Sequence, residues 1–390
     1  MTNKQFLFRF LSLSVFFLLL FGLFNRIVDP FWLYRDSEIK GFNSIKPAYG
    51  NYERQIKPIL VLHDQPEAII LGSSYAEIGF DPNNTFFSEK DHLKGMNLAL
   101  ARAKDDEVQC NFEFAVTHSK IKRALIGIHP TGMPQSDCKK FAQLGEINKL
   151  ELLLSMSSVR DSIKTITNQK NSKATHTEDG RYFFERDKPG VNIRFGEDFV
   201  RYKKQDPRCV KASNTPFTSD VANAVDLSGL KNLISLAKKH DIELVLFVYP
   251  RHAYSLELDN QCGAQDTYWR GMKEIAKLIE AEAQPTTVKA WQFYDYNYLT
   301  TEAIGTTAKY WQDSRHFNVE MGNEMLKTMF DKNAIEPKFG KLITTNTIET
   351  DFRYFLQGRS DYLLSHPEFQ QELRKLENIC SDQINQCKPF

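Results

Sequence analysis

Short runs of Val, Ile, Leu and Phe recur along the chain, and helical patterns separate them. Such continuous apolar runs are typical of parallel strands that are buried on both faces of a sheet. The expected strands begin at Ala68 ("AIILGSS") and cover residues 95–100, 123–130, 242–250 and 288–297. Because strands that alternate with helices require crossover connections, we expect an α/β protein. The prediction is a three-layer α/β/α sandwich around a parallel sheet of about five strands.

The segments between these runs predict amphipathic helices. Residues 226–240 place Leu230, Leu233, Ile234 and Ala237 on one face, with Asp226 as the expected N-cap. Residues 267–283 show the same spacing. These helices are expected to cover the sheet.

A long interval, 131–225, breaks the alternation of strands and helices. We expect a helix over 144–159 and then an irregular, charged surface segment. Because most connections are only a few residues long, an insertion of this length predicts a lid or cap, with a mobile solvated loop as the alternative. The predicted organisation is a membrane anchor over 1–28, an α/β domain over 29–335 that contains the insertion, and a peripheral helical extension over 336–390.

The N-terminus carries an apolar stretch from Phe10 to Phe24 that, extended to Val28, is long enough to span a bilayer as a helix. Lys4 and Arg9 precede it and favour a cytoplasmic N-terminus. No small-x-small cleavage site follows, so we expect an uncleaved signal anchor. A cleaved signal peptide and a buried N-terminal helix remain the alternatives. The predicted location is the inner membrane of a cell envelope, with the folded part on the periplasmic side.

The charge balance and the cysteines narrow the class of protein further. Fifty basic and 49 acidic side chains leave a net charge of +1, which argues against a nucleic-acid partner. An even number of six cysteines without Cys-x-x-Cys favours disulfides over a metal site, with six buried thiols as the alternative. Cys380 and Cys387 are close enough in sequence to pair, and the other four could pair among themselves: Cys110, Cys138, Cys209 and Cys262. No phosphate-loop, dinucleotide or zincin motif occurs, so no cofactor and no metal is predicted.

Two groups of residues carry possible chemistry. Ser73 and Ser74 follow the first strand, at the carboxyl edge of a parallel sheet, where ligands bind. Serine needs a base to act as a nucleophile. Asp313 lies three residues before His316, a spacing that lets a carboxylate accept the imidazole Nδ1–H and direct Nε2 toward a hydroxyl. Asn318 is expected to cap the helix that follows.

In their order along the chain, these residues resemble the SGNH (GDSL-like) hydrolase family. "LGSS" is similar to the first block of that family, with Ser74 at the nucleophile position, and "DSRHF" is similar to the last block. "LGSSYAEIGFDP" resembles the membrane-anchored bacterial branch that acts on cell-envelope polymers. The resemblance implies a catalytic triad of Ser74, His316 and Asp313.

The other two blocks of the family are incomplete. The second normally has a glycine whose N–H helps to form the oxyanion hole, and here Ala101 or Arg102 falls at that place. The resemblance therefore implies an oxyanion hole of backbone donors from Ser74, Ala101 and Arg102. The asparagine of the third block is missing, and His129 near that place is expected to be structural.

Arg251 and His252 follow the fourth expected strand and are candidate substrate-binding residues, with a surface pair as the alternative. The resemblance implies a serine esterase or O-acyltransferase that acts on acyl, above all acetyl, esters of envelope glycans. It also implies a membrane-bound acyltransferase as a partner. A catalytically degenerate binding or scaffold protein of polysaccharide assembly is the alternative.

Overall fold

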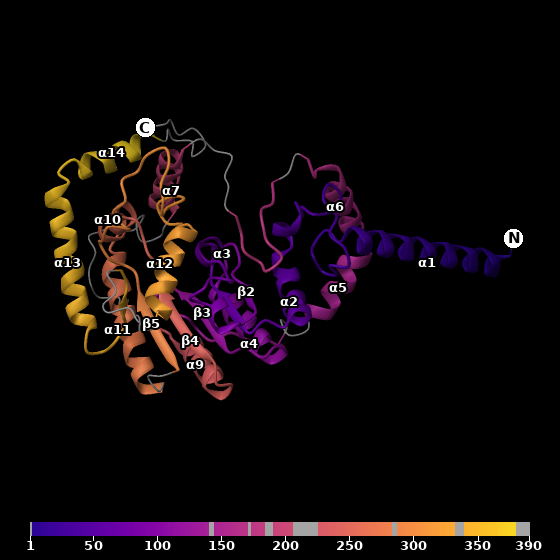
Figure 1. Ribbon diagram of the computed structural model, residues 1–390, viewed down its shortest axis with the longest axis horizontal. Coiled ribbons are helices and arrows are strands. Elements are labelled where there is room, and N and C mark those ends of the chain that lie inside the picture. Colours follow the sequence, from indigo (N-terminus) through magenta and orange to yellow (C-terminus); the bar gives the residue numbers. More distant parts are fainter. Residues whose placement is uncertain are drawn as a thin grey trace.

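The computed structural model describes residues 2–139, 144–170, 173–183, 190–205, 225–282, 287–331 and 339–379. The chain is a mixed α/β protein with a six-stranded, mostly parallel sheet (Figure 1). The strands are β1 (Ala68–Leu71), β2 (Gly95–Asn97), β3 (Arg123–Ile128), β4 (Glu243–Val248), β5 (Val288–Gln292) and β6 (Lys341–Leu342). Their order is β2-β1-β3-β4-β5-β6, and only the β5–β6 pair is antiparallel.

The α/β class and the five parallel strands predicted from the sequence are confirmed. The first register pair joins Ala68 to Gly95 on one side and to Arg123 on the other. β2 and β5 end earlier than predicted, at Asn97 and Gln292. The sequence did not predict β6, because two residues are too few to show a strand pattern.

The helices fill the intervals between the strands. They are α1 (Asn3–Val28), α2 (Glu53–Asp64), α3 (Ser74–Gly79), α4 (Asp105–His118), α5 (Leu144–Leu154), α6 (Met156–Thr167), α7 (Val191–Gln205), α9 (Ser228–Lys239), α10 (Ala253–Gln261), α11 (Ala264–Glu282), α12 (Val319–Phe330), α13 (Ile348–Ser365) and α14 (Phe369–Ile379), with single 3₁₀ turns at Tyr49–Asn51 and Glu89–Asp91. The helix α4 contacts β1, α9 contacts β4, and α11 contacts β5. The helix α9 also contacts α4 and α11.

The apolar face predicted for α9 is buried as expected, but the prediction of Asp226 as its N-cap is wrong. The helix is capped by Leu227, one residue after the predicted Asp226. The Asp226 carboxylate still accepts the Ser228 N–H at 2.9 Å. The acidic residue therefore satisfies an amide of the first turn from outside the helix.

The helices α3 and α12 lie against each other with almost no space between them. A Cβ built on Gly322 of α12 would lie 1.7 Å from the carbonyl oxygen of Gly79, the last residue of α3. A Cβ on Gly79 would lie 2.0 Å from the ring of Phe317. Asn318 caps α12 by accepting the Met321 N–H, as predicted. The two glycines therefore set the distance between the segments that carry Ser74 and His316.

The helix α1 projects from the rest of the molecule (Figure 1). It is long and apolar enough to cross a membrane, with a mean hydropathy of 2.3 over its most apolar stretch. Its side chains are exposed except near its end, where Gly22, Asn25 and Val28 are buried. The alternative of a buried N-terminal helix is therefore wrong. A single-pass membrane anchor is compatible with this arrangement.

The interval 131–225 differs from the expected irregular segment. The predicted first helix is two helices, because Ser155 interrupts it and caps α6 through the Ser158 N–H at 3.2 Å. The helix α7 lies where a charged surface excursion was expected, and it packs against α10 and α14. Its buried apolar residues are Val191, Ile193, Phe195, Phe199, Val200 and Tyr202. Interleaved charges hide this helical spacing in the sequence.

The C-terminal segment is helical, as expected, but it is also part of the core. β6 extends the sheet, and Phe355 and Phe369 are buried. A disulfide joins Cys110 of α4 to Cys138. Cys262 is also disulfide-bonded. The predicted pair Cys380 and Cys387, as well as Cys209, lies outside the described residues.

We predict that Gly322→Ala destabilises the protein by about 1–3 kcal/mol, because the added methyl group forces α3 and α12 apart. Gly358→Ala in α13 is the control, since its Cβ meets nothing closer than 3.4 Å. That variant should keep the stability or gain up to about 1 kcal/mol. Thermal unfolding of the full chain in detergent measures both, and equal melting temperatures for the two variants would contradict the close packing.

Candidate active site

The first part of the site is the turn between β1 and α3. Gly72 has a φ of +144°, and a Cβ there would lie 2.3 Å from the Tyr249 hydroxyl. That hydroxyl accepts the Ser73 N–H at 3.0 Å. Only glycine fits at this position, and the close contact with Tyr249 fixes the turn. Ser74 is the first residue of α3, and its hydroxyl lies in the site.

The second part is the loop that precedes α12. The Asp313 carboxylate is fully buried, and its Oδ1 accepts the backbone N–H groups of Arg315 and His316 at 3.0 and 2.8 Å. Its Oδ1 and Oδ2 lie 2.9 and 2.8 Å from His316 Nδ1. The carboxylate therefore folds the loop around itself and orients the imidazole in the same step.

The structure brings the two parts together. Ser74 Oγ lies 2.9 Å from His316 Nε2, although 242 positions separate the two residues. With Nδ1 held by Asp313, a neutral His316 carries its proton on Nδ1, and its Nε2 can accept the serine proton. The three residues that the sequence singled out thus form one continuous chain from hydroxyl to imidazole to carboxylate.

The electrostatics of Asp313 suit the role of an orienting acid. Burial alone would raise the pKa of its carboxyl group. The neighbouring His316 and the two backbone N–H groups outweigh this effect and hold the pKa well below its usual value. Asp313 is therefore ionised at neutral pH and stabilises positive charge on His316.

An aromatic group surrounds the imidazole. The ring of Tyr75, the residue after Ser74, lies 4.7 Å from the His316 ring between centroids. It lies 5.0 Å from the ring of Tyr249 and 6.3 Å from the ring of His129. His129 also packs on Tyr249 at 5.1 Å. These contacts agree with the expected structural role of His129, and they narrow the space around the serine.

The turn expected to supply oxyanion donors lies beside the turn that carries Ser74. The Leu100 N–H donates to the carbonyl oxygen of Gly72 at 3.1 Å, which places residues 101 and 102 next to the serine turn. Arg102 has a φ of +56°, a left-handed conformation that glycine usually adopts. The backbone at this position is therefore in a conformation that a glycine would adopt without strain. No hydrogen bond in the described structure shows where the Ala101 and Arg102 amides point.

Asn97 of β2 holds α3, the helix that begins at Ser74. Its fully buried side chain donates to the carbonyl oxygens of Ala76 and Phe80 at 3.1 and 3.0 Å. Its Oδ1 accepts the Ala99 N–H at 3.1 Å. The amide therefore satisfies carbonyls at the end of α3 and ties that helix to the neighbouring strand.

Arg251 and His252 are both buried, so the alternative of a surface pair is wrong, and their role in binding substrate stays a prediction. Arg251 is buried, pairs with Asp259 at 3.2 Å and donates to the Tyr268 hydroxyl. His252 is 1% exposed, and it caps α10 and contacts the carbonyl oxygen of Glu302 at 2.8 Å. Both side chains turn into the core, where these partners satisfy them.

The helix α7 of the insertion clamps the loop that carries Asp313 and His316. Asp198 forms an ion pair with Arg315 through two hydrogen bonds and accepts the Ser314 hydroxyl at 2.6 Å. Arg194 donates to the carbonyl oxygen of Gln312 at 2.7 Å. Sequence reasoning missed these contacts, because nothing local relates α7 to a loop more than a hundred residues away.

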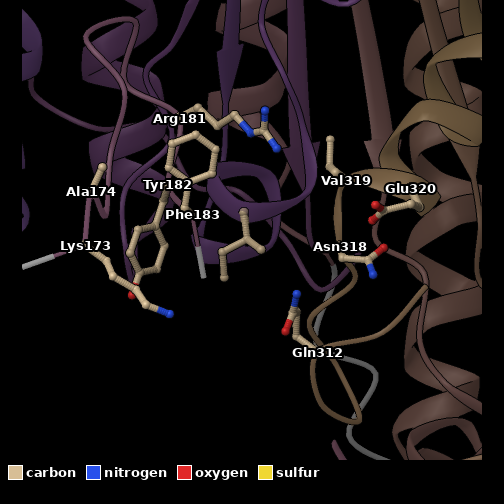
Figure 2. A pocket seen from close by; sticks show the side chains of 10 residues that line it. Lys173, Ala174, Arg181, Tyr182, Phe183, Gln312, Asn318, Val319 and Glu320 are labelled. Carbon is tan, nitrogen blue, oxygen red and sulfur yellow. The ribbon is translucent and has the colours of Figure 1, made fainter. Parts of the chain in front are cut away.

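A cavity of about 540 Å³ opens beside the site (Figure 2). Tyr182 and Phe183 line one wall, and Gln312 and Asn318 line the other. Ile78, also in the lining, lies one turn after Ser74 on the same face of α3. The Gln312 N–H donates to the carbonyl oxygen of His316 at 2.8 Å. The cavity therefore borders the segments that carry the serine and the histidine.

A second polar cluster lies beneath α3 and contains Glu53, Glu77 and His176, all buried. This is the arrangement in the described ranges that could hold a metal ion. The Lys57 ammonium already occupies the cluster, 2.9 Å from Glu77 Oε1 and 3.8 Å from Glu53 Oε2. Because this cation supplies the charge that the carboxylates require, the cluster is better described as a buried ionic network that joins α2, α3 and the segment of His176.

Comparisons with known proteins do not place the chain. No protein-family model matches it, and no curated protein matches its sequence.

We predict that His252→Asn weakens the loss of stability in acid. Burial lowers the pKa of His252 to about 4, whereas an unfolded chain titrates near ~6.5. The neutral ring thus contributes stability above pH ~6.5 that is lost as the pH falls toward ~4, in total about 3 kcal/mol. Asparagine keeps a capping acceptor but does not titrate.

Unfolding of the full chain in detergent at neutral pH and near pH 4 measures this difference. His240→Asn, at an exposed histidine, is the control and should keep the wild-type pH dependence. An identical loss of stability in wild type and His252→Asn would show that His252 does not titrate as described.

Proposed function

We propose that the chain is a membrane-anchored serine esterase or O-acyltransferase of the SGNH (GDSL-like) type. The observation that carries the proposal is the 2.9 Å contact between Ser74 Oγ and His316 Nε2, continued to Asp313 by contacts of 2.8 and 2.9 Å. These distances meet the geometric requirement for a nucleophile, a base and an orienting acid. As part of this proposal, the helices form the outer layers of an α/β/α sandwich.

In the proposed reaction, Ser74 Oγ attacks the carbonyl carbon of an ester while its proton passes to His316 Nε2. The tetrahedral intermediate collapses, the ester C–O bond breaks, and the imidazolium returns the proton to the leaving alkoxide. Water or a sugar hydroxyl then attacks the acyl-enzyme and loses its proton to His316. The bond between Ser74 Oγ and the acyl carbon then breaks, and His316 returns the proton to Ser74 Oγ. The carboxylic acid or the new ester is released.

Backbone amides are the proposed stabilisers of the oxyanion. The Ser74 N–H lies in the first turn of α3, where amides have no acceptor within the helix. The turn of Ala101 and Arg102 is the proposed second source of donors, supported by the hydrogen bond from the preceding Leu100 N–H to the Gly72 carbonyl oxygen. Such donors do not depend on the side chain, so the absent glycine does not preclude the reaction.

The substrate that we propose is an acyl ester, above all an acetyl ester, of an envelope glycan. The cavity of Figure 2 supports this choice, because it adjoins the site and combines aromatic side chains with polar and charged ones, as sites for small polar ligands do. The apolar helix α1 and the disulfide between Cys110 and Cys138 favour a location outside the cytoplasm, in the periplasm. A membrane-bound acyltransferase is the proposed partner that supplies acyl groups.

The helix α7 is proposed to position His316 rather than to contact substrate. Its Asp198 holds Arg315 and Ser314, the two residues between Asp313 and His316. A small displacement of this loop would move Nε2 away from the serine. The insertion thus serves as part of the scaffold of the site.

We predict that Ser74→Ala abolishes covalent labelling of the full chain by a fluorophosphonate probe, because the probe reacts only with an activated serine. Ser73→Ala is the matched control and should keep labelling, since only the Ser74 hydroxyl contacts His316. The readout is gel fluorescence with the protein in detergent. An unlabelled wild type would favour the binding or scaffold protein, and labelling that survives Ser74→Ala would exclude this serine as the nucleophile.

A second prediction concerns Asp198→Asn, which should lower the rate of labelling by about ten- to a hundredfold, the cost of a misplaced catalytic group. Asp198→Glu is expected to recover part of the rate, because the ion pair to Arg315 is restored. The melting temperature of each variant separates local displacement from unfolding. An unchanged labelling rate in a folded Asp198→Asn variant would contradict the positioning role.

A further inference from the structure

The helix α6 is amphipathic in the reverse sense to a helix that covers a core. Its inward face is polar and buried, and it consists of Ser158, Asp161, Ser162 and Thr165. Its outward face carries Met156 and Ile163, which are 61% and 50% exposed and lie two turns apart. Leu150, at the end of the preceding α5, is 59% exposed. Single exposed apolar residues are ordinary, but a helix with its polar face inside requires another explanation.

The position of α5 and α6 relative to α1 supplies the explanation. The Asn25 side chain of α1 donates to the carbonyl oxygen of Leu153 at 2.8 Å and accepts the Ser162 hydroxyl at 2.9 Å. A Cβ on Gly22 would lie 3.0 Å from the Leu154 side chain. The helices α5 and α6 therefore pack against α1 at its C-terminal end.

That end coincides with the edge of the apolar stretch. The residues from Phe10 to Asn25 carry no charge. At ~1.5 Å per residue they cover about 24 Å, which approaches the ~30 Å hydrocarbon thickness of a bilayer. Ile27 is still 53% exposed, and Arg26 lies beside it. If α1 spans a membrane, the grip of α6 on Asn25 lies at the boundary between hydrocarbon and headgroups.

The residues around α5 and α6 fit a position at the boundary between hydrocarbon and headgroups. The cations of Arg26 and Lys149 lie 4.5 and 5.5 Å from the centroid of the Tyr34 ring, in the manner of the aromatic belts at membrane interfaces. Arg160 and Lys164 are exposed on α6 itself. Their long stems can follow an apolar surface while their charges reach lipid phosphates.

We infer that the outward face of α6, with Leu150 of α5, inserts into the membrane interface beside α1, so that its occupant is lipid. This second contact fixes the orientation of the folded part above the bilayer, which a single helix alone would leave free to rotate. The inference rests on the proposal that α1 is a membrane anchor. It is independent of the proposed chemistry at Ser74.

Photocrosslinking to lipid tests this surface. The full chain is reconstituted in lipid nanodiscs of phosphatidylcholine and phosphatidylglycerol, with p-benzoylphenylalanine at one position in each variant. Met156 and Ile163 are the test positions, and Phe16 of α1 is the positive control. The matched negative controls are Tyr354 and Leu364 of α13, which are 61% and 79% exposed and lie at the opposite end of the molecule from α1 (Figure 1).

The expected result is lipid adducts at Met156 and Ile163 in a yield comparable with that at Phe16. No lipid adducts are expected at Tyr354 and Leu364. All test positions are exposed, so each variant should keep the wild-type melting temperature. Adducts at Phe16 without adducts at Met156 and Ile163 would overturn the inference and leave the anchor intact. Adducts to a second copy of the chain would also overturn it. An absence of adducts at Phe16 would refute the anchor and the inference together.

Discussion

The fully buried carboxylate of Asp313 is the group on which the site depends. A buried charge is costly unless hydrogen bonds surround it, and here the backbone amides of Arg315 and His316 and the imidazole of His316 supply them. These same bonds close the loop and direct the imidazole. If the carboxylate is removed, the loop loses the interaction that defines its shape. Local folding and chemistry are therefore one problem at this position.

The distance between the serine and the histidine is fixed by structure that contacts neither. Gly79 and Gly322 allow α3 and α12 to approach at van der Waals contact, and Asn97 ties the end of α3 to β2. From the other side, Asp198 of α7 holds the histidine loop. A contact of 2.9 Å between residues so far apart in sequence requires support of this kind, because the surrounding packing must limit movement to fractions of an ångström.

Much of the fold could be predicted from the sequence because its signals are local, whereas the contact between Ser74 and His316 was expected only from the family resemblance in the order of their motifs. Apolar runs indicate buried strands, and an aspartate three residues before a histidine indicates an oriented imidazole. The burial of Arg251 could not be predicted from the sequence, for a physical reason. A position at the end of a strand says where the backbone lies, but not whether the side chain turns outward or toward a buried partner such as Asp259.

The remaining features are contacts between distant segments. Tyr249 beneath Gly72 and Asp198 beside Arg315 join segments that no periodicity relates. The reversed amphipathicity of α6 could be noticed in the sequence, but its meaning depends on the contact with Asn25. In each case the residue type was visible, and its partner was not.

The most direct measurement is the identification of an acyl-enzyme. The full chain in detergent is mixed briefly with p-nitrophenyl acetate and quenched in acid, and its peptides are mapped by mass spectrometry. One acetyl group is expected on Ser74, and it should disappear on longer incubation as water completes the reaction. Acetylation confined to other residues, or an acetyl group on Ser74 that is never released, would contradict the proposed mechanism.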